Sequence, residues 1–125
     1  MTDRQLVIVA ALTLMVGVGA GAFGAHGLKR MITPDMLTVW QTAVLYQLVH
    51  GLGMLIIAAL GTRMGSPLLN LSGTVMFAGI LIFSGSLYTL VLTGTKWLGA
   101  ITPLGGVAFL IAWAMVAVAA YRAAP

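Results

Sequence analysis

The sequence predicts an all-α protein whose helices cross a membrane as a four-helix bundle. Composition is the first indication, because 61% of the 125 residues are hydrophobic and only 6% are charged, against roughly a quarter in a soluble domain. The second is spacing: the apolar stretches between the charged clusters are long enough to cross a bilayer, which takes about 20 residues. A chain of this composition cannot cover itself with polar surface. We therefore expect a single integral membrane domain over residues 1–125.

Four transmembrane helices are predicted, joined by connections too short to hold a separate domain. Their approximate ranges are 6–25, 36–60, 67–92 and 103–121. Three helix starts carry a hydroxyl residue directly before a proline, at Thr33-Pro34, Ser66-Pro67 and Thr102-Pro103. The hydroxyl can cap the helix, and proline suits the first helical position, where its missing N–H costs nothing.

The predicted ends of the first three helices are each followed by a glycine. These are Gly27, Gly61 and Gly94. Helices commonly end on a residue in the left-handed conformation, which glycine adopts without steric cost. We therefore expect these glycines to terminate the helices.

Glycines inside the first predicted helix raise a different question, because Gly19, Gly21 and Gly24 formally match the G-x-G-x-x-G fingerprint of dinucleotide-binding folds. That fingerprint follows a strand, whereas here an apolar run of transmembrane length precedes it. Lipid supplies no hydrophobic force between helices, so small residues serve to let helices approach closely. This packing function is predicted for Gly17, Gly21, Gly24, Gly79 and Gly105.

Charge and reactive groups exclude several classes of function. The net charge is +4, but the six basic residues are spread over five clusters and form no patch or stripe for nucleic acid. The chain has no cysteine, which excludes disulfides, zinc–thiolate sites and thiol catalysis. It also lacks the G-x-S-x-G elbow of serine hydrolases. We predict that the protein is not an enzyme and uses no metal or cofactor.

Four sequence blocks on successive apolar segments resemble a known family. They are 23-FGAHGL-28, 40-WQTAVLYQLVH-50, 83-FSGSLY-88 and 102-TPLGG-106. In this order they are similar to the small bacterial membrane proteins of domain-of-unknown-function family 423, whose mitochondrial relatives are called transmembrane protein 256. The resemblance implies a four-helix bundle in the bacterial inner membrane. It implies no substrate or catalytic residue.

Orientation in the membrane depends on the basic residues. Each side is expected to carry three of them: Arg4, Arg63 and Arg122 on one, Lys29, Arg30 and Lys96 on the other. Loop charge therefore selects no orientation, and a dual-topology protein would show the same balance. The resembled family carries extra positive charge in its second loop and C-terminal tail, which implies cytoplasmic termini.

All four blocks should lie toward one membrane side, because the ends of helices one and three meet the starts of helices two and four there. We predict that this face is the working surface. Its candidate binding residues are Phe23, His26, Trp40, Gln41, Gln47, His50, Ser86 and Tyr88. A pocket or bound molecule is expected to touch at least three of them.

Two polar side chains, Gln47 and His50, lie one turn apart near the middle of the second helix. Both should point between helices, because an unpaired polar group in hydrocarbon costs several kcal/mol. His50 is either a proton or ligand site or a neutral imidazole hydrogen-bonded to Ser or Thr of a neighbouring helix. His26 stands at a helix C-terminus, where a cation is favourable, so it serves as a helix cap or headgroup contact or as a binding residue.

These observations favour a non-catalytic binding, scaffold or accessory subunit. Its expected partners are membrane lipid, a hydrophobic ligand, a larger membrane complex or further copies of itself, and not nucleic acid. The alternative is a small oligomeric or dual-topology transporter that uses Gln47 and His50.

Overall fold

The structure is a computed structural model that describes residues 1–124. Within this range the chain forms four α-helices and no strand. The helices are α1 (Asp3–Ala25), α2 (Pro34–Met64), α3 (Pro67–Thr93) and α4 (Thr102–Arg122), with short 3-10 helices η1 (Leu28–Arg30) and η2 (Lys96–Ala100) in the first and third connections. All four α-helices are long and apolar enough to cross a membrane. The predicted all-α membrane bundle is confirmed.

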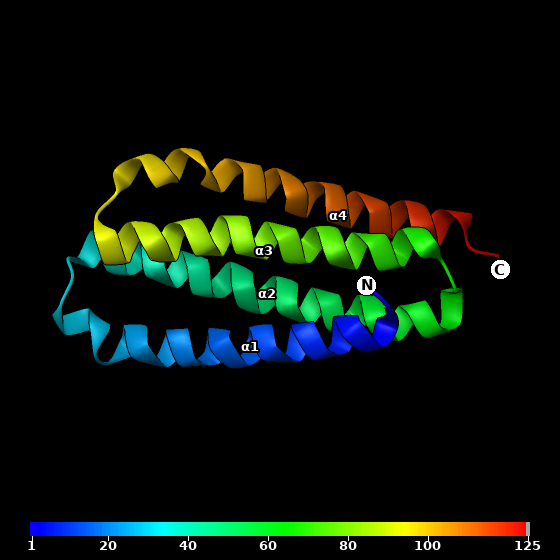
Figure 1. Cartoon of the computed structure of the whole chain (residues 1–125), viewed down its shortest axis with the longest axis horizontal. Helices are drawn as coiled ribbons and strands as arrows, with labels where there is room; N and C mark the ends of the chain where they lie inside the picture. The colour runs from blue at the N-terminus through cyan, green and yellow to red at the C-terminus, as the bar shows by residue number, and fades with distance from the viewer. Residues whose placement is uncertain (125) are drawn as a thin grey trace.

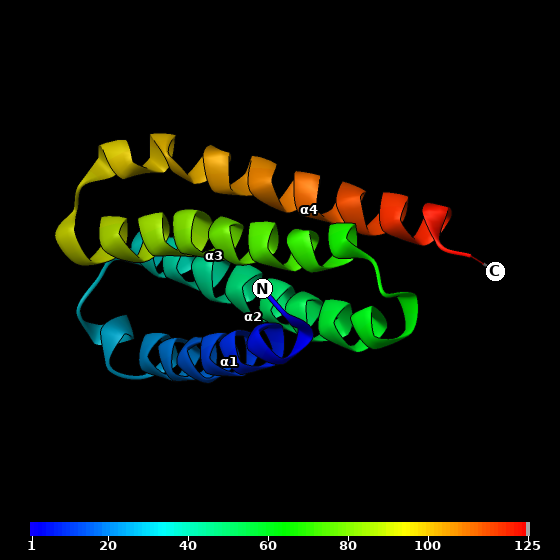
Figure 2. The same cartoon turned by 45° about the vertical axis from the view of Figure 1, so that its right-hand side comes forward.

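The helices pack in chain order, as Figure 1 shows: α1 on α2, α2 on α3, and α3 on α4. Within residues 1–124, α1 and α4 lie at opposite edges of this series and do not touch, which Figure 2 shows from a second angle. α1 meets α3 only slightly, and so does α2 with α4. Helix–helix contact is therefore sparse along two lateral junctions, α1/α3 and α2/α4.

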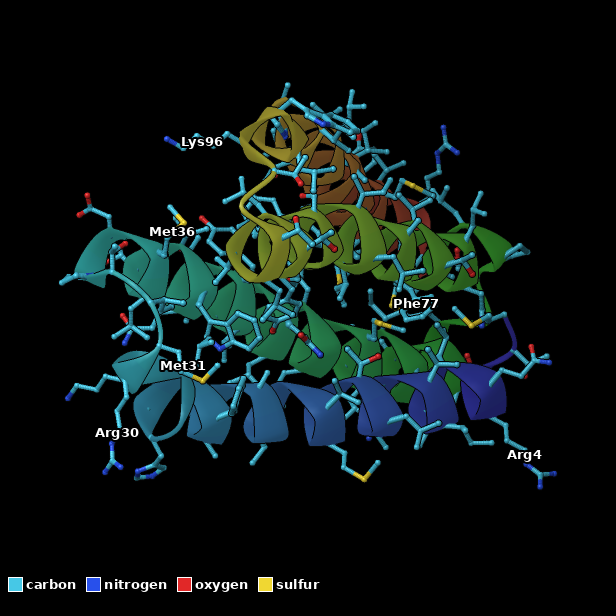
Figure 3. All side chains as sticks on the ribbon, turned by 60° about the vertical axis from the view of Figure 1, so that its left-hand side comes forward. Arg4, Arg30, Met31, Met36, Phe77 and Lys96 are labelled. Carbon is cyan, nitrogen blue, oxygen red and sulfur yellow. The ribbon has the colours of Figure 1, made fainter. Side chains whose placement is uncertain are left out.

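The start of α1 and the end of α4 lie at the same end of the bundle as the connection between α2 and α3 (Figure 1). The first and third connections lie together at the other end. Charged side chains mark the two ends, with Arg4 at one and Arg30 and Lys96 at the other (Figure 3). This distribution leaves an apolar middle, as a membrane-spanning bundle requires.

Helix starts follow the hydroxyl–proline signals in two of three cases. Thr33 Oγ1 accepts a hydrogen bond from Met36 N, and Ser66 Oγ accepts one from Leu69 N. α1 begins at Asp3, earlier than predicted, because Thr2 caps it. Each cap satisfies a backbone donor that the helix itself leaves unpaired.

Thr102 does not cap α4, contrary to the prediction. The helix includes Thr102, and its N-cap is Ile101. The Thr102 hydroxyl instead lies 2.6 Å from Ser86 Oγ of α3 and also donates to the carbonyl of Leu98. A bond between two helices has taken the place of a local cap.

The glycine predictions at helix ends were right at one position of three. Gly94 ends α3 in the left-handed conformation, with φ of 71°. α2 continues past Gly61 and ends on Gly65, with φ of 55°. Gly61 instead lies against the Asp3 side chain of α1, while Gly27 keeps a right-handed φ of −66°.

Glycines inside the helices lie at the helix contacts. A Cβ at Gly105 would be 2.5 Å from the backbone N of Phe83, and one at Gly79 would be 3.2 Å from the carbonyl oxygen of Gly105. The backbones of α3 and α4 are thus in direct contact. On α1 the glycines face side chains: a Cβ at Gly17 would be 2.8 Å from Leu48, and one at Gly24 would be 2.6 Å from Trp40.

Gly21 is less tightly packed than its neighbours in the predicted stripe. A Cβ there would lie 3.3 Å from Val44 Cγ1, which is a contact that a small shift of the valine can relieve. The α1 glycines therefore receive larger side chains of α2, whereas the α3 and α4 glycines let two backbones meet.

Candidate binding site between helices

The eight predicted binding residues separate into groups that face different parts of the bundle. One group is an aromatic cluster near the first and third connections. The ring centroids of Phe23 and Trp40 are 5.9 Å apart, and those of Trp40 and Tyr88 are 4.6 Å apart. Trp40 Nε1 donates to the carbonyl of Ala20 at 2.8 Å. This cluster joins α1, α2 and α3 and fills their ends.

Gln47 continues from this cluster toward the middle of the bundle. It is 5% exposed. Its Nε2 donates to the Thr13 carbonyl of α1 at 2.8 Å, and its Oε1 accepts from the Tyr88 hydroxyl of α3 at 2.6 Å. One side chain of α2 therefore connects both neighbouring helices.

His50 points between helices as well, but it turns toward α4. Its Nδ1 lies 2.8 Å from the Tyr46 carbonyl, and its Nε2 lies 3.1 Å from Trp113 Nε1. A carbonyl can only accept and an indole N–H can only donate, so His50 is neutral with its proton on Nδ1. Its ring also stacks on Phe109, with centroids 3.6 Å apart.

This geometry matches the neutral, helix-bridging imidazole rather than the proton site. The partner is a tryptophan, not the predicted Ser or Thr. A second proton on Nε2 would face the Trp113 N–H and break that bond. Within the described chain, the surroundings of His50 are aromatic, with Tyr46 and Phe109 on its ring.

The remaining candidates do not join either group. Ser86 bonds to Thr102 and thereby links α3 to α4. His26 and Gln41 are exposed. Within residues 1–124, no three His, Asp or Glu side chains lie close enough together to hold a metal ion.

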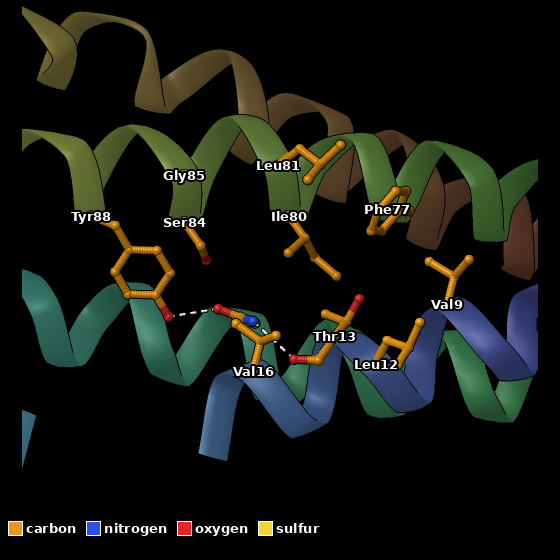
Figure 4. A pocket seen from close by; sticks show the side chains of 11 residues that line it. Val9, Leu12, Thr13, Val16, Phe77, Ile80, Leu81, Ser84, Gly85 and Tyr88 are labelled. Carbon is orange, nitrogen blue, oxygen red and sulfur yellow. Dashed lines mark hydrogen bonds between the residues drawn. The ribbon is translucent and has the colours of Figure 1, made fainter. Parts of the chain in front are cut away.

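A groove opens at the α1/α3 junction, halfway along the helices (Figure 4). Its volume is about 430 Å³, within the range of roughly 300–1,000 Å³ that is usual for small-molecule sites. The walls are apolar side chains of α1 and α3: Val9, Leu12, Val16, Phe77, Ile80 and Leu81. Residues of three helices line it, since Gln47 of α2 borders it as well.

A few polar side chains also border the groove. Gln47 and Tyr88 border it with their mutual hydrogen bond, and Ser84 borders it while its Oγ donates to the Ala43 carbonyl at 2.7 Å. Thr13 borders it from α1, and its side chain is directed toward α3 in Figure 4. The groove thus combines apolar walls with a small set of polar groups, the usual make-up of a ligand site.

The groove touches two of the eight predicted residues, Gln47 and Tyr88. The expectation that one pocket would touch at least three was wrong. Phe23 and Trp40 occupy the end of the bundle with their own rings, so the space lies nearer the middle. The sequence contained one indication of the groove's position, because Thr13 is the one polar residue between Leu6 and Ala20.

Two other hollows are less suited to a membrane ligand. One, of about 270 Å³, is lined by residues of α2 alone: Leu45, Tyr46, Val49 and His50. The other has a larger volume, about 660 Å³, but is a shallow depression at the terminal end, around Asp3 and Asn70. Asn70 Nδ2 donates to Asp3 Oδ1 at 2.7 Å there, so those polar groups already satisfy each other.

Comparison with known proteins identifies the lineage. A model described as "Protein of unknown function (DUF423)" matches residues 20–106. A UPF0382 membrane protein of Staphylococcus aureus strain bovine RF122 is 51% identical over 95% of this chain and 97% of its own length. UPF0382 membrane protein YwdK of Bacillus subtilis is 49% identical over 95% of this chain and 98% of its own. No solved structure matches. With a family model covering most of its length and relatives this similar, the chain belongs to the DUF423 family of membrane proteins.

Proposed function

We propose that this protein is a non-catalytic binding subunit of the bacterial inner membrane that holds an apolar molecule in the α1/α3 groove. The observation that carries the proposal is the groove itself: about 430 Å³ of space halfway along the helices, with apolar walls and a few polar side chains at its border, among them the hydrogen-bonded Gln47 and Tyr88. A groove that opens sideways is reached from the lipid phase and needs no path through water.

The site differs from the predicted one in its depth. Prediction placed the working face at the first and third connections, whereas the groove begins at Tyr88 and extends away from them to Val9 and Phe77. The aromatic cluster of Phe23, Trp40 and Tyr88 then forms its closed end. The binding function is retained in this proposal, with Gln47 and Tyr88 as the predicted residues that remain part of the site.

A transporter receives less support from the same geometry. The transporter alternative depends on an ionisable group within the membrane, and His50 was the candidate. Both its ring nitrogens are engaged, and its neighbours are aromatic rings. Gln47 is occupied in joining three helices.

The proposed orientation places both termini in the cytoplasm. It rests on the charge distribution of the resembled family, because the basic residues of this chain are balanced. Single cysteines replacing Arg63 and Lys96, which are exposed at opposite ends, should react with a membrane-impermeant maleimide from opposite sides. Labelling of Lys96→Cys from outside intact cells is expected. Labelling of both variants from both sides would indicate dual topology.

The binding function can be tested by filling the groove. Gly85 borders the groove, and a Cβ there meets no atom within 4 Å. Gly85→Leu should therefore occupy the space without straining the helices. Gly19→Leu is the matched control, since Gly19 also has no atom within 4 Å and lies outside the groove.

Both variants would be purified from membranes in mild detergent, and the co-purifying lipid-phase molecules measured by mass spectrometry. The parent and Gly19→Leu should retain the same apolar molecule at near-stoichiometric amounts, and Gly85→Leu should lose it. Equal retention by Gly85→Leu and Gly19→Leu would overturn the proposal.

A further inference from the structure

Two hydrogen-bond donors border the α1/α3 groove without an acceptor. Within the described residues the Thr13 hydroxyl forms no hydrogen bond, although the side chain is only 8% exposed. A primary amide carries two N–H donors, and Gln47 uses one of them, toward the Thr13 carbonyl. Both side chains line the groove.

The other polar groups of the groove are already committed. Tyr88 donates to Gln47 Oε1, and Ser84 donates to the Ala43 carbonyl. What the groove lacks is therefore an acceptor opposite Thr13 and Gln47. No charged side chain lines it, so a ligand with a formal charge would remain uncompensated in hydrocarbon.

From these positions we infer that the groove binds an uncharged apolar molecule that presents a ketone oxygen to Thr13 and Gln47, the chemistry of a prenylated quinone. This inference rests on the proposed binding function and names its ligand class. The ring carbonyl accepts from the two free donors, and the prenyl tail lies along the aliphatic walls. The assignment concerns binding, and no electron transfer is part of it.

Depth distinguishes a ring ketone from the ester carbonyl of a phospholipid. Thr13 lies ten residues after the start of α1 and twelve before its end, which is about 15–18 Å from either end at 1.5 Å per residue. The hydrocarbon core is about 30 Å thick, so Thr13 lies near its middle. Ester carbonyls lie at the interface, beyond the reach of these donors, whereas a quinone ring without a charged headgroup can enter the core.

The test uses two probes that differ only in the carbonyls: a naphthoquinone with a geranylgeranyl tail, and the naphthalene with the same tail. Each is titrated into the purified full chain in neutral detergent micelles, and binding is followed as the rise in unfolding temperature. The quinone should bind more tightly than the naphthalene. Thr13→Val, which keeps the shape and removes the hydroxyl, should weaken quinone binding about fivefold, the effect of one neutral hydrogen bond.

Control variants distinguish the effect of losing the Thr13 hydroxyl from the effect of changing the shape of the site. Thr13→Val should leave naphthalene binding unchanged, and Thr13→Ser should retain quinone binding. Thr89→Val removes a hydroxyl that bonds to the Gly85 carbonyl on the exposed side of α3, and it should change neither affinity. If Thr13→Val weakens the binding of both probes equally, the hydroxyl acts through van der Waals contact and not through a hydrogen bond, and the inference is overturned.

The outcomes also separate this inference from the proposed function. Equal affinity of the parent for the two probes would overturn the ketone assignment and leave the binding function standing. If neither probe binds while a phospholipid is lost in Gly85→Leu, the occupant is an acyl chain and the ketone assignment is again overturned. If no molecule is bound by the parent in either experiment, both the inference and the proposed function are wrong.

Discussion

Two sides of α2 each bury a polar side chain against a neighbouring helix, but the packing around the two side chains differs. Gln47 and His50 lie three residues apart, which places them about 60° apart around the helix. Each is 5% exposed and hydrogen-bonded to a neighbouring helix. Yet the α1/α3 side keeps a groove of about 430 Å³ lined by three helices, whereas the hollow beside His50, whose ring stacks on Phe109, is smaller, at about 270 Å³.

The difference lies in the side chains that the lateral helices contribute. α4 supplies Phe109, which stacks on His50 and lies 5.5 Å from Phe83 between ring centroids, and Trp113, which donates to His50. α1 supplies Leu12, Thr13 and Val16, none of which is aromatic. Satisfying a buried polar group therefore does not by itself close a junction between helices, since closure requires enough volume.

Phe109→Ala should have the largest effect, because it would remove the ring that packs on His50. The ring is 4% exposed, and its loss should lower the free energy of unfolding by about 3 kcal/mol, the lower end for such truncations. Unfolding in detergent would measure this. Phe23→Ala is the control. The Phe23 side chain is 44% exposed, so its loss should lower the free energy of unfolding by less. Equal losses would mean that Phe109 does not hold the α2/α4 junction.

Trp113→Phe should have the next largest effect. It keeps an aromatic ring but leaves His50 Nε2 without its donor, at a cost of about 1 kcal/mol. Adding His50→Phe to the same chain should recover part of this loss, because the orphaned acceptor is then gone. A double-mutant cycle in detergent measures the coupling. Simple additivity of the two changes would argue against the Trp113–His50 bond.

Tyr88→Phe makes the corresponding change on the open side. It removes the hydroxyl that donates to Gln47 Oε1 and should cost about 0.6 kcal/mol, the average for hydrogen bonds between membrane helices. The aromatic ring still closes the end of the groove, so retention of an apolar molecule should persist. A loss as large as that of Phe109→Ala would show that this bond, not packing, dominates the open side.

Leu81→Phe should have the smallest effect on stability and the most informative effect on binding. Leu81 borders the groove and is 59% exposed, so the change should alter the free energy of unfolding by no more than about 0.5 kcal/mol. An added ring should close the open side as Phe109 closes the other. The co-purifying molecule should then be lost, and its retention would mean that aromatic volume does not explain the difference between the sides.

Some features of the site were predictable because they depend on single residues in a known solvent. Gln47 and His50 had to point between helices, since lipid cannot satisfy an amide or an imidazole. The cap positions Thr33 and Ser66 follow from local chemistry in the same way. Thr102 failed as a predicted cap because its hydroxyl bonds to Ser86, sixteen residues earlier in the sequence.

The location of the groove was not predictable from these local signals. Phe23, Trp40 and Tyr88 were expected to leave room for a ligand, but Trp40 packs edge-on against Phe23 and at a tilt against Tyr88, and the three rings fill the end of the bundle. Thr13 was visible as an isolated polar residue in an apolar run. That it faces space rather than a partner depends on the distance between α1 and α3, which no single segment encodes.

By itself, the sequence determined that the chain spans a membrane four times, where most spans begin and end, and which polar side chains must be buried. These follow from hydropathy, capping and the cost of unpaired groups in hydrocarbon. Tertiary structure decided that α1 and α4 stay apart, that His50 meets Trp113 and Gln47 meets Tyr88, and that the groove lies between α1 and α3. The physical reason is that lipid is as apolar as the helix faces, so hydropathy does not select which faces meet. Shape and a few hydrogen bonds select them, and both depend on how the helices are placed together.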